Sequence, residues 1–220
     1  MREIVTFDAY GTLVDFRLSG PTQELLQDRI DEVGVDAKAF LETFRIMRFQ
    51  AVLEAYRPYD EVLRSSLQKA MRMHGLRYQD SDGDVIVAQI PTFGPFPEVP
   101  EALRRLKSRY EIAIISNTQD HLIKQNIELI GVEFDHVITA EQAGAYKPDR
   151  QTFEYAYKTM DIAPAQVIHA AQGWEYDIIP GNDLGLNRLV WINRSGLPGS
   201  AAYQYEELRD MTTLPELLGC

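Results

Sequence analysis

The stretch "IVTFDAYGTLVD", residues 4–15, decides the fold class because it leads an apolar run directly into a charged turn. The run at 4–7 is typical of a buried strand, and the next residue is the carboxylate Asp8. An ionised carboxylate without a partner is expensive to bury, so we expect Asp8 to meet solvent or a substrate. Gly11 permits a turn that would strain other residues. The stretch therefore predicts a functional site at the end of the first strand.

Similar apolar runs recur along the chain, and amphipathic segments of helical length separate most of them. This alternation is typical of a parallel α/β sheet. Residues 16–90 carry helix-like periodicity without a comparable strand, so we interpret them as a helical insertion. The run "IPTFGPFPEVP" at 90–100 marks the return to the core, because Pro and Gly disfavour helix and sheet alike. The predicted strands are residues 4–7, 112–115, 137–139, 167–171 and 189–192.

The composition excludes several classes of partner. A chain of 220 residues with 45% hydrophobic content is ordinary for a globular protein. Its net charge of −11 and its pI near 4.8 argue against a nucleic-acid or anionic-membrane binder, which ordinarily has a basic face. A small anionic substrate would therefore need local cations in order to bind.

Cysteine usage and the absence of an apolar leader indicate the cellular compartment. The single cysteine, Cys220, excludes an internal disulfide and a cysteine metal cluster, and it fits a reducing environment. The first residues lack a basic-then-apolar leader, and no run approaches the roughly 18 apolar residues of a membrane span. We expect a soluble cytoplasmic protein with no membrane partner.

Polar residues follow most of the predicted strands, at the edge where open parallel sheets bind ligands. They are Asp8, then Ser116 and Asn117, then Lys147 in the loop "AYKPD", then Asp177. Each has an ordinary alternative: Asp, Ser and Asn often cap helices, an acid in a first turn is stabilised by the helix dipole, and a lysine is usually solvated. Their convergence on one edge favours a site.

In this order, Asp8, Ser116, Lys147 and Asp177 resemble the four motifs of the haloacid dehalogenase superfamily. The resemblance covers essentially the whole chain, and the helical insertion stands in the place of that family's cap domain. It implies an α/β fold with a Rossmann-like parallel sheet core and a helical cap domain inserted after the first strand. The expected core comprises residues 1–15 and 91–220, and the expected cap comprises residues 16–90.

Two positions indicate which member of the superfamily this chain resembles. The family's phosphatases carry a second aspartate two residues after the nucleophile, and here that position holds Tyr10. A phenol, with a pKa of about 10 against about 4 for a carboxyl, cannot easily protonate a leaving alkoxide. A halide leaving group needs no proton, so "FDAYGTL" resembles the L-2-haloacid dehalogenases in particular. Gln172 stands where magnesium-dependent phosphatases carry an acid, so we expect no metal cofactor, with Mg²⁺ required only by a phosphatase.

The resemblance implies a catalytic group of four residues. Asp8 attacks the carbon that bears the halogen and forms an aspartyl ester, and a water held near Asp177 then attacks the ester carbonyl. Lys147 and Thr12 are expected to position Asp8 and keep it ionised, because a nearby cation lowers the pKa of a carboxyl.

The resemblance also implies a group of residues that binds substrate. Ser116 is expected to hold the substrate carboxylate, and Asn117 to contribute to a halide cradle that a cap arginine completes. Loose alignment favours Arg48 over Arg45, although a solvated helix arginine explains either equally well. Aromatic side chains are expected to wall the pocket, with ordinary core packing as the alternative. The expected substrate-binding residues are Tyr10, Arg48, Ser116, Asn117, Gln172 and Trp174.

The fourth motif departs from the dehalogenase pattern. A serine and an asparagine are usual where this chain has Gln172 and Trp174, and an indole only donates hydrogen bonds. This leaves Asp177 to activate water, with Gln172 free to hydrogen-bond that water or Lys147. His169 is interpreted as a strand residue that supports the loop rather than as a catalytic base.

The predicted function is therefore hydrolytic displacement of halide from a small 2-haloacid. Three alternatives stay open: a phosphatase of this superfamily, a hydrolase of another activated small carboxylate, and a non-catalytic binding protein, since fold alone does not fix function. Homodimers are common among the dehalogenases that the chain resembles, but no feature of the sequence identifies an interface.

Overall fold

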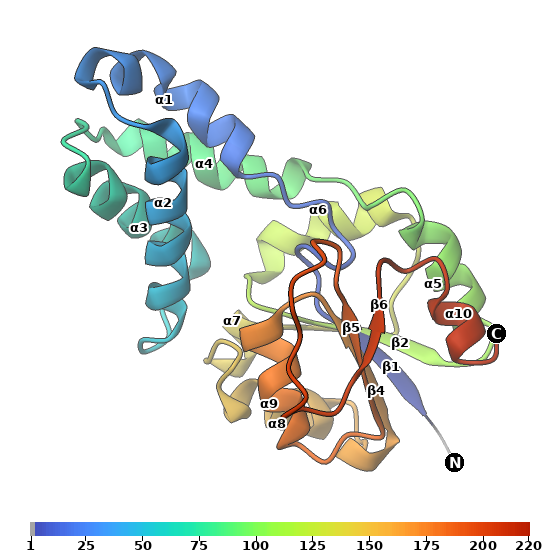
Figure 1. Cartoon of the computed structure of the whole chain (residues 1–220). Coiled ribbons are helices and arrows are strands. Elements are labelled where there is room, and N and C mark those ends of the chain that lie inside the picture. Colours follow the sequence, from blue (N-terminus) through green and yellow to red (C-terminus); the bar gives the residue numbers. More distant parts are fainter. Residues whose placement is uncertain (1–2) are drawn as a thin grey trace. The chain divides into compact units, whose positions relative to one another are not determined.

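The computed structural model describes residues 3–220 and divides into two compact units (Figure 1). An α/β unit contains the chain up to Asp15 and Gly94–Cys220, and a helical unit contains Phe16–Phe93. The sequence placed the second boundary after residue 90, three residues before the division seen here. No helix in the described part of the chain combines the length and apolar character needed to cross a membrane.

The α/β unit is built on a parallel sheet, as the sequence predicted. Its strand order is β3-β2-β1-β4-β5-β6, and every neighbouring pair is parallel. Each of the five predicted strands is present, and β6 was not predicted because its residues carry two glutamates and no apolar run. The strands are β1 (Ile4–Phe7), β2 (Glu111–Ser116), β3 (His136–Thr139), β4 (Val167–Ala171), β5 (Arg188–Ile192) and β6 (Glu206–Leu208).

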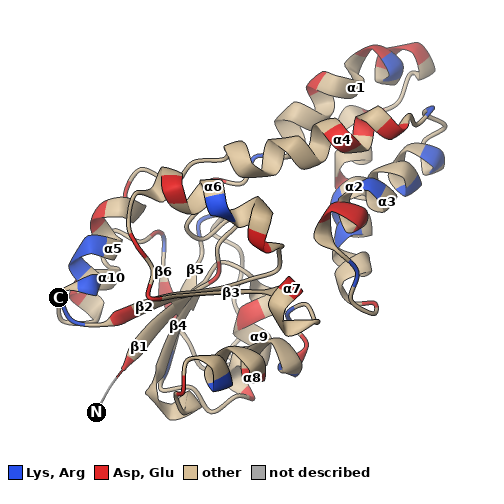
Figure 2. Cartoon of the chain, turned by 180° about the vertical axis from the view of Figure 1, so that it is seen from behind, with Lys and Arg blue, Asp and Glu red and all other residues tan. Residues whose placement is uncertain are grey.

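Helices cover both faces of this sheet, which explains why its central strands β1 and β4 are buried throughout. In both ribbon views α5 and α6 lie on one side of the sheet, and α8 and α9 lie on the other (Figures 1 and 2). All four residues of β1 are buried, as expected for a central parallel strand. The helices of this unit are α5 (Val99–Lys107), α6 (Asp120–Ile130), α7 (Ala140–Ala143), α8 (Arg150–Thr159), α9 (Ile179–Asn182) and α10 (Leu214–Leu217).

The strand order reverses direction at β1, which places the loop after β1 between the loops after its two neighbours. The chain runs from β1 to β2 and β3 on one side, and it returns to β4 and β5 on the other. Register aligns Phe7 with Ile114 and with Ala170, so the residues that follow emerge at one edge. Open parallel sheets bind ligands at such a crossover.

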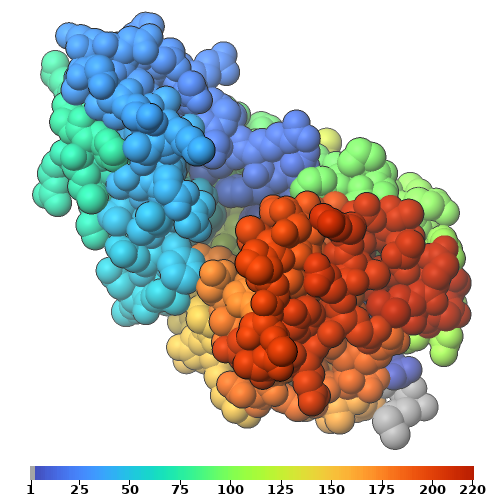
Figure 3. Space-filling view, in the orientation of Figure 1, coloured from blue at the N-terminus to red at the C-terminus, as the bar shows by residue number. Residues whose placement is uncertain are grey.

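The C-terminal part of the chain completes the α/β unit. In the space-filling view the orange and red residues spread over a broad face of this unit (Figure 3). Figure 2 shows acidic and basic residues interspersed along the helices, with lysine and arginine residues gathered near the end of α5. Cations at a helix C-terminus are favoured by the helix dipole.

The helical unit consists of four helices followed by a short 3-10 turn, Ile90–Thr92. Its helices bury apolar side chains, among them Phe40 and Phe44 of the second helix and Leu63 and Leu67 of the third. This agrees with the helical periodicity of the sequence. The helices are α1 (Ser19–Val33), α2 (Ala37–Val52), α3 (Tyr59–Met73) and α4 (Asp80–Gln89).

Candidate active site

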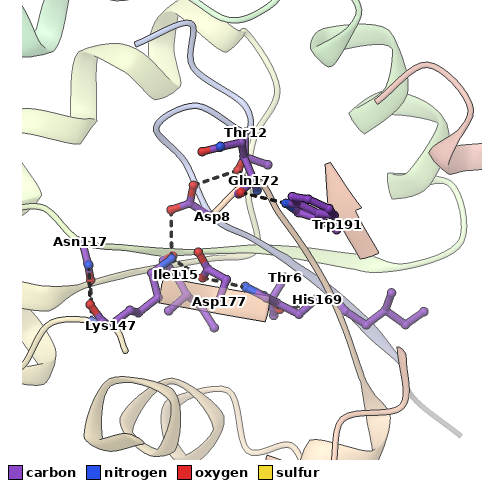
Figure 4. Close-up of polar contacts among 11 residues, drawn as sticks. Thr6, Asp8, Thr12, Ile115, Asn117, Lys147, His169, Gln172, Asp177 and Trp191 are labelled. Atoms are coloured by element: carbon purple, nitrogen blue, oxygen red, sulfur yellow. Dashed lines mark hydrogen bonds and ion pairs between the residues drawn. The ribbon is translucent and has the colours of Figure 1, made fainter. Parts of the chain in front are cut away.

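Three charged side chains from three separate loops and turns meet in the α/β unit (Figure 4). Asp8 follows β1, Lys147 lies between α7 and α8, and Asp177 lies in a single π-helical turn, Trp174–Ile178, after β4. The Lys147 Nζ lies 3.0 Å from Asp8 Oδ1 and 2.6 Å from Asp177 Oδ1. It also donates to the carbonyl oxygen of Ile115 at 2.8 Å. One buried ammonium thus joins two carboxylates.

Burial and the neighbouring charges shift the pKa values of these three groups in different directions. Burial alone would lower the pKa of Lys147, but Asp177 and Asp8 together raise it above its ordinary value. Burial would raise the pKa of Asp177, but Lys147 and His169 lower it below its ordinary value. For Asp8, burial and the charge of Asp177 outweigh Lys147, so the pKa of Asp8 is raised.

The raised pKa of Asp8 reflects burial as well as the effect of Lys147 that the sequence predicted. Lys147 does pull the pKa of Asp8 downward, as predicted, but this is not the dominant effect. Asp8 is only 9% exposed, so loss of hydration penalises its ionised form. A second carboxylate that shares the same ammonium adds repulsion. Ionised Asp8 is consequently a poorly stabilised anion.

The second oxygen of Asp8 is held by the turn that the opening stretch predicted. Thr12 Oγ1 donates to Asp8 Oδ2 at 2.8 Å and accepts from the backbone N–H of Gln172 at 2.8 Å. The turn closes through backbone hydrogen bonds from Thr12 and Leu13 to the carbonyl of Ala9. Both oxygens of the carboxylate are therefore oriented.

Gly11 is needed at this turn for two reasons. Its φ of +89° lies in the region that favours glycine. A side chain there would also bring its Cβ to 3.1 Å from the Gln172 Oε1. The close approach of the loop after β4 to the loop after β1 thus depends on a residue without a side chain.

A histidine of β4 contacts the same oxygen of Asp177 that Lys147 does. His169 Nε2 lies 3.0 Å from Asp177 Oδ1, and His169 Nδ1 lies 2.8 Å from Thr6 Oγ1. Asp177 Oδ2 is buried and forms no hydrogen bond with any residue between 3 and 220. Burial and the charge of Asp177 also raise the pKa of Tyr157, so its phenol stays protonated.

Three predicted substrate-binding residues have partners or surroundings that the sequence did not reveal. Ser116 is fully buried at the end of β2, and within the described chain its hydroxyl has no hydrogen-bond partner. Asn117 instead binds the backbone of Lys147, with its Nδ2 donating to the carbonyl at 2.8 Å and its Oδ1 accepting from the N–H at 2.7 Å. Tyr10 donates its hydroxyl to Asn126 Oδ1 at 2.9 Å.

Gln172 and Trp174 contribute to the loop after β4 mainly through the backbone and through packing. Lys147 directs its Nζ to Asp8, Ile115 and Asp177, so of the two partners considered for Gln172, Lys147 and the hydrolytic water, only the water stays a prediction. The carbonyl of Gln172 accepts from Trp191 Nε1 at 3.1 Å. Trp174 packs in an aromatic cluster, with ring centroids 4.6 Å from Trp191, 5.3 Å from Tyr205 and 5.7 Å from Tyr203.

The two candidate arginines of the helical unit differ in their surroundings. The Arg48 guanidinium carbon lies 4.8 Å from the ring centroid of Phe44 and 5.7 Å from that of Phe16. Arg45 instead forms an exposed ion pair with Glu42 at 2.8 Å. The part of Arg48 in a halide cradle stays a prediction.

Arg194 contacts the turn that follows β1, and the sequence analysis did not identify it. It follows β5 by two residues and donates to the carbonyl of Thr12 at 2.7 Å. It also pairs with Glu98 at 2.7 Å and lies 3.6 Å over the ring of Phe96. The strand-end rule that found Asp8 would have found Arg194 if it had also been applied to the fifth strand.

The side chains around Asp8 form a poor donor set for Mg²⁺. Within residues 3–220 there is no group of three or more His, Cys, Asp or Glu side chains placed to hold a metal ion. Asp8 and Asp177 already share the ammonium of Lys147. Gln172 offers only a neutral oxygen at the position of the family's other acid, whereas Mg²⁺ in proteins usually takes carboxylates and substrate phosphate.

A parallel sheet with an aspartate–lysine–aspartate cluster at its carboxyl edge defines the class of protein. A family model described as haloacid dehalogenase-like hydrolase matches residues 3–185. The chain therefore belongs to the haloacid dehalogenase-like hydrolase family, as the order of its motifs predicted.

Relatives and solved structures agree with this assignment. (S)-2-haloacid dehalogenase 4A of Burkholderia cepacia is 26% identical over 220 residues, which cover 96% of this chain and 91% of the relative. The (S)-2-haloacid dehalogenase of Pseudomonas sp. (strain YL) is 25% identical over 196 residues, which cover 87% of this chain and 83% of that relative. The solved L-2-haloacid dehalogenase from Xanthobacter autotrophicus shares the fold, with a TM-score of 0.82, 19% identity and coverage of 99% and 98%.

Replacing Lys147 by methionine is expected to destabilise the α/β unit by about 3–5 kcal/mol, because two buried carboxylates then lose their shared cation. Adding Asp8→Asn to this variant should recover part of the loss, since one buried carboxylate remains. Urea unfolding of the three proteins measures both effects. Lys158→Met, at an exposed position of α8, is the matched control and should change stability by less than about 0.5 kcal/mol. An equal loss in both methionine variants would contradict the role of the ammonium.

Asp8→Asn alone is expected to leave the protein at least as stable as the unsubstituted chain at neutral pH. The pKa of Asp8 is raised in the folded protein, so Asp8 contributes stability below its unfolded pKa and loses it as the pH rises through the folded pKa. The advantage of asparagine should therefore disappear in acid, where Asp8 is protonated in both states. Urea midpoints at neutral and acidic pH measure this. A variant that is less stable than the unsubstituted protein at neutral pH would contradict the assigned direction.

Proposed function

We propose that this protein hydrolyses small 2-haloacids by displacing halide with Asp8. The observation that carries the proposal is the state of that carboxylate. It is nearly buried, it is oriented at both oxygens by Lys147 and Thr12, and its pKa is raised. A poorly solvated, fixed carboxylate is suited to act as a nucleophile. The names of the (S)-2-haloacid dehalogenase relatives support this substrate class.

The first step forms an ester. Asp8 donates an electron pair to the carbon that bears the halogen, the new carbon–oxygen bond forms from the rear, and the halide leaves with the electrons of the broken bond. No proton is needed by the leaving group. This suits a chain with Tyr10 where phosphatases carry an acid, because the Tyr10 hydroxyl already donates to Asn126.

The second step restores the enzyme. Water attacks the ester carbonyl of Asp8 and the acyl–oxygen bond breaks. One water proton passes through Asp177 to the departing alkoxide, which leaves as a 2-hydroxy acid. The oxygen of the water stays on Asp8, and the second proton is released to solvent when that carboxyl ionises.

A phosphatase is the second candidate, and one relative favours it. The glyceraldehyde 3-phosphate phosphatase of Methanothermobacter thermautotrophicus is 32% identical, but only over 101 residues, or 44% of this chain. Two features weigh against a phosphatase. Tyr10 stands where the phosphatases carry an acid, and Gln172 gives the site a poor set of donors for Mg²⁺. We therefore propose that halide release needs no added metal.

The role of the helical unit is also part of this proposal. We infer that it acts as the cap, with Arg48 supplying a cation for the halide. Arg48 is a better candidate for this role than Arg45. Within the described residues Arg48 Nε has no hydrogen-bond partner, whereas Arg45 is paired with Glu42. The cytoplasmic location and the homodimer stay predictions.

Chloroacetate or L-2-chloropropionate should yield chloride in the presence of a chelator, and Asp8→Asn should abolish this release. The matched control is Asp161→Asn, because Asp161 is exposed and its φ of 51° is one that asparagine tolerates. Chloride is measured by ion chromatography, alongside phosphate release from an aryl phosphate with Mg²⁺. Phosphate release without chloride release would favour the phosphatase, and chloride release that survives Asp8→Asn would exclude the proposed nucleophile.

A single turnover in ¹⁸O-labelled water should place the label in Asp8. The label enters there because water attacks the acyl carbon and not the substrate. Mass spectrometry of peptides that contain Asp8 measures its incorporation, with the Asp8→Asn protein as the control. Label confined to the hydroxy acid would instead indicate direct attack of water on the substrate.

A further inference from the structure

His169 is a buried titratable group beside Asp177, and the proposed mechanism does not use it. It lies within β4, and its side chain is fully buried. Both ring nitrogens are within hydrogen-bond distance of a partner, Asp177 Oδ1 at 3.0 Å and Thr6 Oγ1 at 2.8 Å. The ring of Phe153 packs edge-on against it at 6.0 Å. The imidazole is thus fixed in orientation as well as in position.

Asp177 assigns the direction of one of these hydrogen bonds. An ionised carboxylate only accepts, so His169 Nε2 carries the hydrogen and donates to Asp177. His169 Nδ1 pairs with the hydroxyl of Thr6, which also lies 3.5 Å from the carbonyl oxygen of Ile168. Thr6 belongs to β1, immediately before the strand end that carries Asp8, and is itself fully buried. The strand that presents the nucleophile therefore also holds the histidine (Figure 4).

The two oxygens of Asp177 consequently have different surroundings. Oδ1 accepts from both Lys147 and His169, at 2.6 and 3.0 Å. Oδ2 is buried and, in the part of the chain that the structure describes, has no hydrogen-bond partner. It lies so close to Gly173 that a Cβ on that residue would stand 2.4 Å from it. A buried carboxylate oxygen needs a hydrogen-bond donor, and a water molecule is the simplest one.

We propose that His169 is a positioning residue for ester hydrolysis: it fixes Asp177 Oδ1 so that Oδ2 stays free to take the proton of the attacking water. The inference rests on the proposed function. Without His169, Asp177 would be held by Lys147 alone, and either oxygen could turn toward the ammonium. Within the described part of the chain His169 forms no hydrogen bond or ion pair with Asp8, so its loss acts on hydrolysis and leaves displacement of the halide largely intact.

The proton and electron balance is that of the second step of the reaction. Asp177 Oδ2 accepts one proton as the water oxygen bonds to the ester carbon of Asp8. That proton is then delivered to the alkoxide oxygen as the acyl–oxygen bond breaks. His169 keeps its own proton throughout, since it only donates a hydrogen bond to Oδ1.

The test compares ester accumulation in His169→Leu and His169→Gln. Leucine removes the donor at similar volume, whereas glutamine can keep an N–H near the position of Nε2. With 2-chloropropionate, His169→Leu should retain a first-turnover burst of chloride, whereas its steady-state release should fall at least about tenfold, because a positioned general base contributes roughly 10²–10⁴-fold. Intact-protein mass spectrometry should show the ester accumulating. His169→Gln should restore most of the turnover.

Thr6→Val and His136→Leu complete the experiment. Thr6→Val removes the partner of Nδ1 and should accumulate a smaller amount of ester, which keeps the test decisive if His169→Leu fails to fold. His136→Leu, in β3, is the matched control, because His136 is partly exposed and pairs weakly with Glu111 at 3.8 Å. It should accumulate no ester.

Three different results would overturn the inference. Equal loss of the burst and of the steady state in His169→Leu, or unchanged turnover, would show that His169 does not act on hydrolysis, and the proposed function would stand. Absence of chloride release from the unsubstituted protein would overturn the proposed function and the role of His169 with it.

Discussion

The buried ammonium of Lys147 is the constraint on which the rest of the site depends. Asp8 and Lys147 are 139 residues apart, and only the register of the parallel strands brings them together. Two carboxylates at this depth would repel each other and lose hydration unless a cation lay between them. Lys147 supplies that cation, and Asn117 fixes its backbone through two hydrogen bonds. Asn117, which directly follows β2, thus holds Lys147, and Lys147 in turn neutralises Asp8 after β1 and Asp177 after β4.

This arrangement also sets what the site cannot do alone. Lys147 is compensated by two carboxylates, so the cluster has no spare positive charge for an anionic substrate. The whole chain carries a net charge of −11, which offers no long-range attraction to an anion. A 2-haloacid would therefore need donors beyond Lys147. Within the α/β unit, the buried hydroxyl of Ser116 is one such potential donor.

The sequence predicted the parts of this structure that follow from local pattern. Apolar runs located five strands, and asking which polar residues follow them found Asp8, Lys147 and Asp177. The same reasoning could not find β6, because a short edge strand rich in glutamate carries no apolar signal. It also could not give the net direction of the pKa of Asp8, since that direction depends on burial and on a second carboxylate. The backbone partners of Asn117 lie 30 residues away, and no sequence pattern shows them.

The loop after β4 shows how the site tolerates its departure from the dehalogenase pattern. This loop reaches Asp8 through the N–H of Gln172 and the hydroxyl of Thr12, and it carries Asp177 itself. Trp191 holds the carbonyl of Gln172, and Trp174 anchors the loop by packing against Trp191. Because these contacts use backbone groups and aromatic surface, they do not require a serine or an asparagine at either position. What the loop must preserve is the carboxylate of Asp177, because this is the group that His169 and Lys147 both hold through its Oδ1.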